Sequence, residues 1–342
     1  MIDWSTFQPT GNQPVALAQM TSGCARQIGP CAAYEGIRTE LQAIASQQRL
    51  TGGFQVVLDI YGVPPWAAKA PSGCEKPGTS SFSRPLTAVA LGDYRALVGS
   101  LLALADQQGV RIDWWSPWNE PNQPFFISPQ RESCASGASA VSPSVYAQLA
   151  DAMAQELNAH GGEHHLLLGE LAGYTTGSEH HTSISEFIAA LPTQLICMSN
   201  VWSVHAYATV HRRALAEEPV QMLEQALDSR GRCGQSAQIW ITETGTGSAA
   251  ARSELNMSSL PRPTESQQRE GCRTLAARLA HWYADPRVRA VFQYTFREDP
   301  AYPVGLISAD LTHLFPVYAL WLAWSKALAA GGPAPALPSQ CA

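Results

Sequence analysis

The sequence predicts an α/β fold in which βα units surround a parallel sheet. Short β-rich runs alternate with helix-like segments along the chain, which favours a parallel sheet over a sandwich or a helical bundle. The β-rich runs look buried and lack the strict alternation of a half-exposed sheet. With 342 residues and 45% hydrophobic content the chain can bury a large core, and this length suits one α/β barrel as well as two ordinary domains.

The β-rich runs predict strands at residues 54–60, 110–115, 165–171, 200–205, 238–243 and 290–296. Three long loops rich in Ser, Gly and Pro follow strands, at residues 70–85, 124–142 and 244–266. In a parallel α/β barrel such loops rise from the face where the strands end. They are therefore expected to form the walls of a cleft.

Helices are expected at residues 34–50, 93–108 and 143–160, and from Pro316 to about residue 330. The first two carry one apolar face each, and the second stops at Gly109. Ser142 is the expected N-cap of the third, with Pro143 at its first helical position. The last helix stops at Gly331, where a Pro-rich tail begins.

Charge and hydropathy exclude two classes of partner. The net charge of −6 and the pI near 5.8 leave no broad basic surface, so no nucleic-acid partner is expected. The longest apolar stretch, residues 316–324, is far shorter than the ~20 residues that span a bilayer, so no membrane anchor is expected. We expect a monomer.

Eight cysteines are spread along the chain, none in a CxxC pair, so a structural zinc site or a redox motif is not expected. Most lie in loop-like stretches, which favours disulfides, an oxidising compartment and secretion. Local pairings considered among many connectivities are Cys24–Cys31, Cys74–Cys134 and Cys233–Cys272. The first residues lack the basic start and apolar core of a signal peptide, so a mature or trimmed form is expected.

Two of the predicted strands end in a glutamate. Residues 113–122, Asp-Trp-Trp-Ser-Pro-Trp-Asn-Glu-Pro-Asn, present Glu120 among aromatic side chains, and residues 238–245 deliver Glu243 where an apolar run meets glycine. Hydrolysis of a glycosidic bond needs one carboxylic acid to protonate the leaving oxygen and one carboxylate to meet the charge at the anomeric carbon. Pro121 biases Glu120 toward an extended backbone. A lone strand-end glutamate is as often a solvated acid, but the neighbouring tryptophans and asparagines favour a site.

Residues 118–122, Trp-Asn-Glu-Pro-Asn, resemble the Asn-Glu-Pro signature of clan A glycoside hydrolases, the retaining (β/α)8 TIM barrels, with families 39 and 5 the nearest in character. The resemblance covers about residues 54–325. It implies one catalytic barrel domain over residues 1–342, with Glu120 as general acid/base at the end of the fourth strand and Glu243 as nucleophile at the end of the seventh. It implies no cofactor and no metal.

Other stretches extend the resemblance. Residues 60–67, Ile-Tyr-Gly-Val-Pro-Pro-Trp-Ala, resemble a third-strand end and imply that Trp66 lines the sugar site. Residues 202–207 resemble the sixth-strand end with its His-x-Tyr, which implies that Tyr207 lies beside Glu243 and keeps it ionised. Residues 305–310 and 316–319 resemble the closing loop and the final helix.

Two features depart from the clan. No convincing pair of strands precedes residue 54, so the barrel is expected to be trimmed or irregular at its first two strands. Arg26 is only a weak counterpart of the clan's second-strand arginine, and Tyr294, Phe296 and Arg297 stand where the clan has a tryptophan at the eighth-strand end. The candidate substrate-binding residues are Trp66, Trp115, Trp118, Asn119, Asn122, His205, Tyr207, Tyr294, Phe296 and Arg297.

The predicted function is that of a secreted retaining β-glycoside hydrolase acting by double displacement on a β-linked oligo- or polysaccharide. One alternative is a non-catalytic carbohydrate-binding protein on the same barrel. A metal-dependent hydrolase is a third hypothesis, but the adjacent pairs His164-His165 and His180-His181 lack the helical spacing of HExxH. Glu170 ends the predicted strand at residues 165–171, the fifth strand in the barrel that the resemblance implies, and a salt bridge and a place in the site are equally good interpretations.

Overall fold

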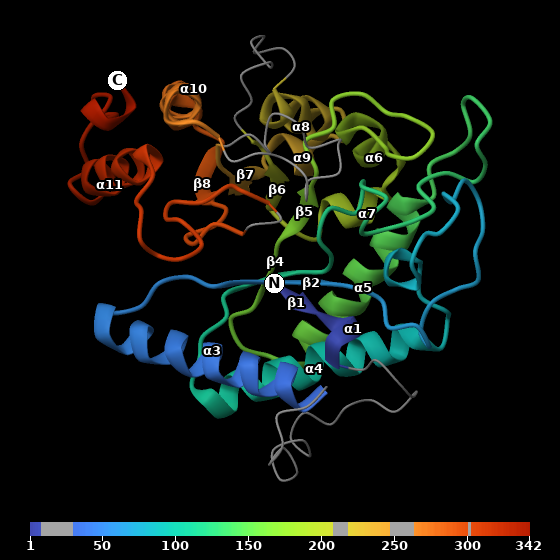
Figure 1. Cartoon of the computed structure of the whole chain (residues 1–342). Coiled ribbons are helices and arrows are strands. Elements are labelled where there is room, and N and C mark those ends of the chain that lie inside the picture. The colour runs from blue at the N-terminus through green and yellow to red at the C-terminus, as the bar shows by residue number, and fades with distance from the viewer. Residues whose placement is uncertain (8–29, 208–217, 247–262, 300–301) are drawn as a thin grey trace. The chain divides into compact units, whose positions relative to one another are not determined.

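A computed structural model of the chain describes residues 1–7, 30–207, 218–246, 263–299 and 302–342 (Figure 1). Its contacts group into two compact units. The first consists of Met1–Trp202 with Gln225–Ala237, and the second of Ser203–Glu224 with Gln238–Ala342. Both contain parallel strands and helices, as the sequence predicts for an α/β fold. Closure into a barrel and assembly into one domain stay predictions.

The first unit contains a parallel sheet with strand order β1-β2-β3-β4. The strands are β1 Ile2–Asp3, β2 Val57–Tyr61, β3 Trp114–Ser116 and β4 His165–Leu166. In the register, Ile2 lies opposite Ile60, Leu58 opposite Trp115, and Trp114 opposite His165. After Leu167 the chain continues as β5 Leu168–Leu171, so the predicted strand at residues 165–171 is two strands.

Strand β1 is an element that the sequence did not reveal. Two residues are too short a run to carry a periodic signal. The adjoining helix α1, Trp4–Phe7, begins with Trp4, which is fully buried and meets Trp66 and Tyr94 edge to face at 5.9 Å each. An aromatic side chain of this size buries a large apolar area, so it fixes the start of the chain against the first unit.

Three long helices of the first unit pack side by side, α3 Pro30–Thr51 against α4 Ala90–Gln108 and α4 against α5 Ser142–His160 (Figure 1). Helix α4 ends where Gly109 adopts a left-handed conformation with φ 67°, as predicted. The predicted N-cap of α5 is wrong. Ser142 is the first residue of the helix, and Val141 occupies the cap position. The Ser142 hydroxyl donates to Gln130 Oε1 at 2.9 Å and therefore does not cap the helix.

The described part of the first unit also contains η1 Ser81–Ser83, α6 Ile184–Ala190, α7 Thr193–Ile196 and α9 Arg232–Gln235. Helix α6 begins with a capping box. The Ser183 hydroxyl accepts from the Glu186 backbone N–H at 3.2 Å, and the Glu186 carboxylate accepts from the Ser183 N–H at 3.0 Å.

Strand β6 Val201–His205 and helix α8 Pro219–Asp228 each begin in one unit and end in the other. In the second unit, β6, β7 Gln238–Thr244 and β8 Val288–Gln293 are neighbours in that order, and β7 pairs with β8 in parallel. Helices α10 Glu265–Ala284 and α11 Pro316–Ala329 pack together, and η4 Ser339–Cys341 packs on both (Figure 1).

The described residues form three disulfides, Cys74–Cys134, Cys197–Cys233 and Cys272–Cys341. The first confirms a predicted pairing. The pairing of Cys233 with Cys272 is wrong, because each finds a different partner inside its own unit. Cys24, of the pairing with Cys31, lies outside the described residues. Across the described ranges, no helix is both long and apolar enough to cross a membrane.

Candidate active site

Glu120 follows the end of β3 on a turn that backbone hydrogen bonds define. The Asn119 N–H donates to the carbonyl of Ile60 on β2 at 3.1 Å, and the Gln123 N–H donates to the Glu120 carbonyl at 2.9 Å. The turn gives Glu120 a left-handed backbone with φ 35°, so the extended conformation expected from Pro121 is wrong. Such a backbone costs about 1–3 kcal/mol in a non-glycine residue and is concentrated at functional sites.

The side chains of Glu120 and Asn119 beside this turn differ in which of their polar atoms are already hydrogen-bonded. Glu120 is half-buried, and the Gln123 side-chain amide donates to its Oε2. Asn119 is only 3% exposed, and its Oδ1 has no hydrogen-bond partner in the described part of the chain. A buried acceptor without a partner is uncommon, since most buried polar atoms are hydrogen-bonded. Asn119 therefore offers an acceptor next to the carboxylate of Glu120.

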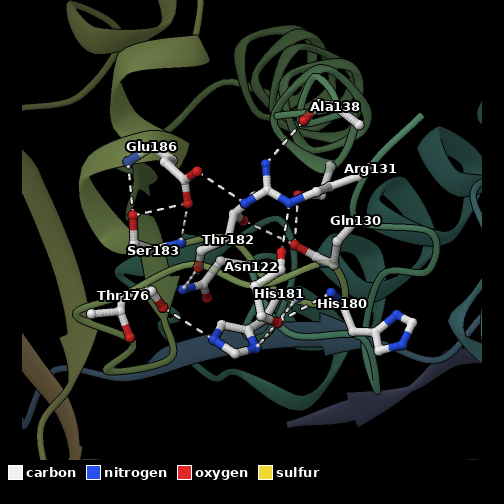
Figure 2. A network of polar contacts seen from close by, with 12 residues as sticks. Asn122, Gln130, Arg131, Ala138, Thr176, His180, His181, Thr182, Ser183 and Glu186 are labelled. Atoms are coloured by element: carbon white, nitrogen blue, oxygen red, sulfur yellow. Dashed lines mark hydrogen bonds and ion pairs between the residues drawn. The ribbon is translucent and has the colours of Figure 1, made fainter. Parts of the chain in front are cut away.

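Asn122 has a structural role rather than the predicted sugar-binding one. It is fully buried, its Nδ2 donates to the carbonyls of Ala172 at 2.9 Å and Thr182 at 3.2 Å, and its Oδ1 accepts from the Ala172 N–H at 2.8 Å (Figure 2). The side-chain amide of Asn122 therefore hydrogen-bonds the loop after β3 to the segment after β5. No atom of it is left for a sugar hydroxyl.

Gln130 extends this polar network (Figure 2). Its Nε2 donates to the carbonyl of Pro121 at 3.0 Å, and its Oε1 accepts from the hydroxyls of Ser142 and Thr182 at 2.9 Å each. All of these groups are buried, so each hydrogen bond replaces one that the unfolded chain makes with water. The network fixes the peptide directly after Glu120, and no sequence motif announced it.

Arg131 anchors the outer part of the same loop (Figure 2). Its guanidinium donates to the carbonyls of Ser178 at 2.6 Å and Ala138 at 3.1 Å and to Glu186 Oε1 at 2.9 Å. Burial alone raises the pKa of Glu186, but the hydrogen bonds from Ser183 and Arg131 outweigh it, and the pKa is lowered. Glu186 therefore stays ionised and holds Arg131 in place.

Trp66, Trp115 and Trp118 were predicted to contact a sugar, and the structure encloses the last two. Trp115 is fully buried and donates from Nε1 to the Ile112 carbonyl at 3.2 Å. Trp118 is 1% exposed and donates to the Phe126 carbonyl at 3.0 Å. Both rings are enclosed by protein, so neither face is available to a sugar. Trp66 is half-buried and stays a candidate.

Glu170 ends β5 and is buried, so it is no solvated acid. It too has a left-handed backbone, with φ 48°. Burial raises the pKa of Tyr146, whose hydroxyl accepts from the Gly169 N–H at 2.7 Å, and the negative charges of Glu170 and Asp59 add to the rise. Asp59 on β2 is buried as well, so the first unit holds two carboxylates inside it.

In the second unit, Glu243 near the end of β7 lies beside two side chains from the end of β6. The Tyr207 hydroxyl donates to Glu243 Oε2 at 2.5 Å, and His205 Nδ1 lies 3.4 Å from the same oxygen. The strand ends are held together because the Ala206 N–H donates to the Glu243 carbonyl at 2.9 Å and the Thr244 hydroxyl donates to the Ala206 carbonyl at 2.6 Å. The contact expected between Tyr207 and Glu243 is therefore present.

Tyr207 belongs to a cluster of three tyrosines in the second unit. The ring centroid of Tyr302 lies 5.5 Å from that of Tyr207 and 5.8 Å from that of Tyr294, and buried Val304 packs against Tyr207 and Tyr302. Tyr302 was not a candidate from the sequence, because only the fold brings it to Tyr207. Tyr294 is half-buried in this cluster and keeps its place as a candidate.

The other predicted contacts near the end of β8 are at the surface of the second unit. Phe296 is 62% exposed and Arg297 is exposed. The Phe296 carbonyl accepts from the backbone N–H groups of Leu306 at 2.9 Å and Ile307 at 3.0 Å. These backbone bonds hold the closing loop, and neither side chain is built into the tyrosine cluster. Arg26 lies outside the described residues.

The histidine pairs make separate contacts. His164 Nδ1 lies 3.1 Å from the Ile112 carbonyl, and His165 packs on Trp114 with ring centroids 4.8 Å apart. His181 stacks on Tyr174 at 4.1 Å and bonds to the Ser178 hydroxyl at 2.8 Å, whereas His180 contacts Cys74 and Glu179. Each imidazole thus has a hydrogen-bonding or packing role of its own.

No protein-family model and no curated protein sequence matches the chain. Solved structures do match it. SrfJ from Salmonella typhimurium has a TM-score of 0.55 at 10% identity, over 90% of this chain and 59% of that one. A conserved exported protein from Bacteroides fragilis has a TM-score of 0.52 at 14% identity, over 81% and 54%.

A third match is a calcium-binding mutant of β-glucuronidase 2 from Bacteroides uniformis, with a TM-score of 0.50 at 13% identity, over 87% of this chain and 33% of that one. At these identities the likeness shows a shared fold. The chain spans between 33% and 59% of the length of these three structures.

Proposed function

We propose that the chain is a retaining β-glycoside hydrolase in which Glu243 is the nucleophile and Glu120 the general acid/base. The observation that carries the proposal is the 2.5 Å hydrogen bond from the Tyr207 hydroxyl to Glu243 at the end of a parallel strand. A hydroxyl that donates to a carboxylate favours its ionised form, which is the form a nucleophile needs. A merely structural acid at a strand end does not require such a donor.

The two glutamates would act in two steps. Glu243 attacks the anomeric carbon and forms a glycosyl–enzyme ester, while Glu120 gives its proton to the departing glycosidic oxygen. Glu120 then takes a proton from water, the water oxygen attacks the anomeric carbon, and Glu243 leaves as the carboxylate. The sugar thereby keeps its configuration, and no cofactor enters either step.

Asn119 and the half-buried aromatic residues would hold the sugar. The unpartnered Oδ1 of Asn119 is an acceptor for a sugar hydroxyl next to Glu120. An acceptor that is buried without a partner in the free protein gains a full hydrogen bond on binding, so it discriminates strongly for a hydroxyl. Trp66 and Tyr294 are the proposed apolar walls.

The fold shared with a β-glucuronidase supports a β-linked carbohydrate as the substrate class. The three disulfides support an oxidising compartment and hence secretion, and the likeness to an exported protein agrees with it. Fold likeness cannot choose the sugar, since one fold supports many activities.

The test is mechanism-based labelling. A 2-deoxy-2-fluoro glycoside of the hydrolysed sugar should form a stable ester on Glu243, which peptide mass spectrometry locates. Labelling of another carboxylate would overturn the assignment. In addition, proton NMR of the first-formed product should show the β-anomer, and an α-anomer would rule out retention.

The rival hypothesis, a carbohydrate-binding protein without catalysis, makes a different prediction for Glu120→Gln. The hydrolase loses turnover of substrates with poor leaving groups, because the acid is gone, yet continues to bind them. The rival has no turnover to lose. A screen of the unmodified protein against β-linked plant and microbial polysaccharides therefore decides between the two.

A further inference from the structure

A groove of about 550 Å³ lies in the first unit on the same loop as Glu120. One wall comes from residues 76–83, the other from residues 124–128, and His180 lies at its edge. Its volume is in the range of small-molecule sites, about 300–1,000 Å³, so it has room for more than one sugar ring. The candidate catalytic residues are not part of its lining.

Phe82 and Phe125 line the groove and belong to a cluster of four aromatic rings. Phe82 and Phe125 have ring centroids 5.4 Å apart, and Phe126 meets Phe125 at 5.0 Å. Tyr61, at the end of β2, contacts Phe82 at 5.8 Å and Phe126 at 5.9 Å and closes the cluster from below. Phe125 is 59% exposed although its neighbours are half-buried. The ring of Phe125 thus exposes an apolar surface to solvent, and three other aromatic rings pack in the same cluster.

This exposed ring is held rigidly. The Ser83 hydroxyl donates to the Phe125 carbonyl at 2.5 Å, and the Ser128 N–H donates to the Ser83 carbonyl at 2.7 Å. The disulfide Cys74–Cys134 links the two loops that form the walls. An aromatic side chain on a fixed backbone loses little entropy when a ligand covers it, so the ring is prepared for binding.

Polar groups line the groove together with the two aromatic rings. Thr79 and Ser80 supply hydroxyls, and the ammonium of Lys76 lies on the exposed rim. A pyranose ring has the complementary character, with apolar C–H faces and a polar edge of hydroxyls. Its face packs on an aromatic ring while its edge takes hydrogen bonds from the rim. A peptide or lipid partner has no comparable need for this combination.

The groove lies on the loop that carries Glu120, the proposed acid/base. The segment that carries Phe125 begins at the turn after Glu120, and the Phe126 carbonyl accepts from the indole of Trp118 next to Asn119. A chain of sugar rings bound at Glu120 can therefore follow this loop away from the site. We propose that the groove is a secondary subsite for a β-linked polysaccharide chain, with Phe125 as its stacking platform. The inference deepens the proposed hydrolase and rests on it for the identity of the chain.

The test measures binding separately from turnover. Isothermal titration in the Glu243→Gln background uses xylohexaose, cellohexaose and laminarihexaose as probes. Phe125→Ala should weaken the best of these by about tenfold, since an aromatic face is lost from the contact, while Phe125→Tyr keeps the ring and stays within about twofold. Phe54→Ala is the matched control, because Phe54 is 41% exposed and precedes β2, at the opposite end of that strand from Tyr61.

Kinetics provide the second readout. In the otherwise unmodified enzyme, Phe125→Ala should raise KM for the polysaccharide about tenfold and leave kcat/KM for the aryl glycoside of a single sugar unchanged, since one sugar does not reach the groove. Equal affinity of Phe125→Ala and its parent for every hexasaccharide, or binding of none of the three, overturns the subsite. Phe125-dependent binding by a protein that hydrolyses nothing overturns the hydrolase and leaves the groove as a carbohydrate site.

Discussion

The Tyr207 hydroxyl donates to Glu243 Oε2 at 2.5 Å, and removal of this one oxygen atom abolishes the contact. Tyr207→Phe should lower kcat by about a hundredfold, because one charge-assisted hydrogen bond contributes on the order of 1.5–3 kcal/mol. The acid limb of the pH–rate profile should move to higher pH, since the ionised carboxylate loses a donor.

Tyr283→Phe is the control for this substitution. Tyr283 is 48% exposed and donates to the Gly332 carbonyl at 3.1 Å, so its hydroxyl is lost without effect on the carboxylate. Both rates and both pH profiles are measured on the same aryl glycoside. An unchanged acid limb in Tyr207→Phe would remove the role assigned to the hydroxyl.

Substitution of Asn119 and of Asn122 should have different effects, the first on activity and the second on stability. Asn122→Ala leaves the N–H of Ala172 and the carbonyls of Ala172 and Thr182 buried without their partner, so the free energy of unfolding should fall by about 2–4 kcal/mol. Asn119→Ala removes an acceptor that bonds to nothing in the described residues, so stability should change by less than about 1 kcal/mol while kcat/KM falls.

Urea unfolding and steady-state kinetics of the two variants check this expectation. A stable and inactive Asn122→Ala would show that the network around Asn122 is not what fixes the loop. A fully active Asn119→Ala would exclude the proposed sugar contact.

The sequence predicts the chemical role of a single residue more readily than its exposure to solvent. The contact between Tyr207 and Glu243 was expected from the resemblance of residues 202–207 to a sixth-strand end with His-x-Tyr, and it is present. The burial of Trp118 did not, because an indole at a strand end can face either the core or solvent and the residue type is the same in both cases. Tyr302 was missed because its neighbour Tyr207 is far away in the sequence and only the fold joins them.

At the scale of elements, the loops that build the site depend on covalent and polar ties that no local pattern encodes. The double variant Cys74→Ser/Cys134→Ser opens the link between the two walls of the groove. It should lower the free energy of unfolding by about 2–4 kcal/mol, because the unfolded chain regains the entropy that the cross-link removes. Hexasaccharide binding should weaken as well, since Phe125 loses its fixed frame.

The disulfide Cys197–Cys233 gives the matched control in the same unit. Replacing both of its cysteines by serine should reduce stability by a similar amount and leave hexasaccharide binding unchanged at temperatures where the variant is folded. Titration below the unfolding transition, for both double variants, separates the two effects. Equal loss of binding in both would mean that the groove responds only to overall stability.

The ion pair between Arg131 and Glu186 predicts a pH dependence of the same loop. The pKa of Glu186 is lowered from its ordinary value of 4.5, so its contribution is present above that value and is lost as pH falls through the lower, folded-state pKa. Its side chain is 43% exposed, so solvent screens the pair and the effect should be small. Glu186→Gln should therefore lower Tm at pH 7, and its Tm difference from the parent protein should be smaller at pH 3.

The control for this prediction is Glu265→Gln. Glu265 also pairs with an arginine, Arg269, at 2.7 Å, but it is 76% exposed on helix α10. Its substitution should leave Tm nearly the same at both pH values. A Tm difference for Glu186→Gln that grows as the pH falls would contradict the assigned sign.

The predicted strands and helices could be recognised because the pattern of apolar residues within each segment indicates its secondary structure. The six predicted strands and four helices lie within a few residues of observed ones. The pairing of Cys233 with Cys197 rather than Cys272 was beyond reach, since it depends on which loops meet in space. The predicted N-cap of α5 was wrong for a related reason. The side chain of Gln130, which lies 12 residues earlier, accepts the hydrogen bond of the Ser142 hydroxyl.

For the whole molecule, the parallel α/β class follows from the alternation of strands and helices, and the likeness to SrfJ and the exported protein is a likeness of fold. The start of the chain resisted prediction. Strand β1 pairs in register with β2, yet its two residues are held there by burial of Trp4 rather than by a strand pattern. Tertiary packing, not local propensity, decides such short elements.

The cross-links allow a prediction for the molecule as a whole. The three disulfides within the described ranges close segments with sequence separations of 60, 36 and 69 residues. Each contributes about 2–4 kcal/mol, and together they approach the 5–15 kcal/mol that folded proteins typically have. Dithiothreitol should therefore lower the thermal midpoint by well over 10 °C, and oxidised dithiothreitol should not. Mass spectrometry after alkylation counts the cysteines released. A reduced protein with an unchanged midpoint would mean that the core alone stabilises the fold, and the argument for an oxidising compartment would lose its basis.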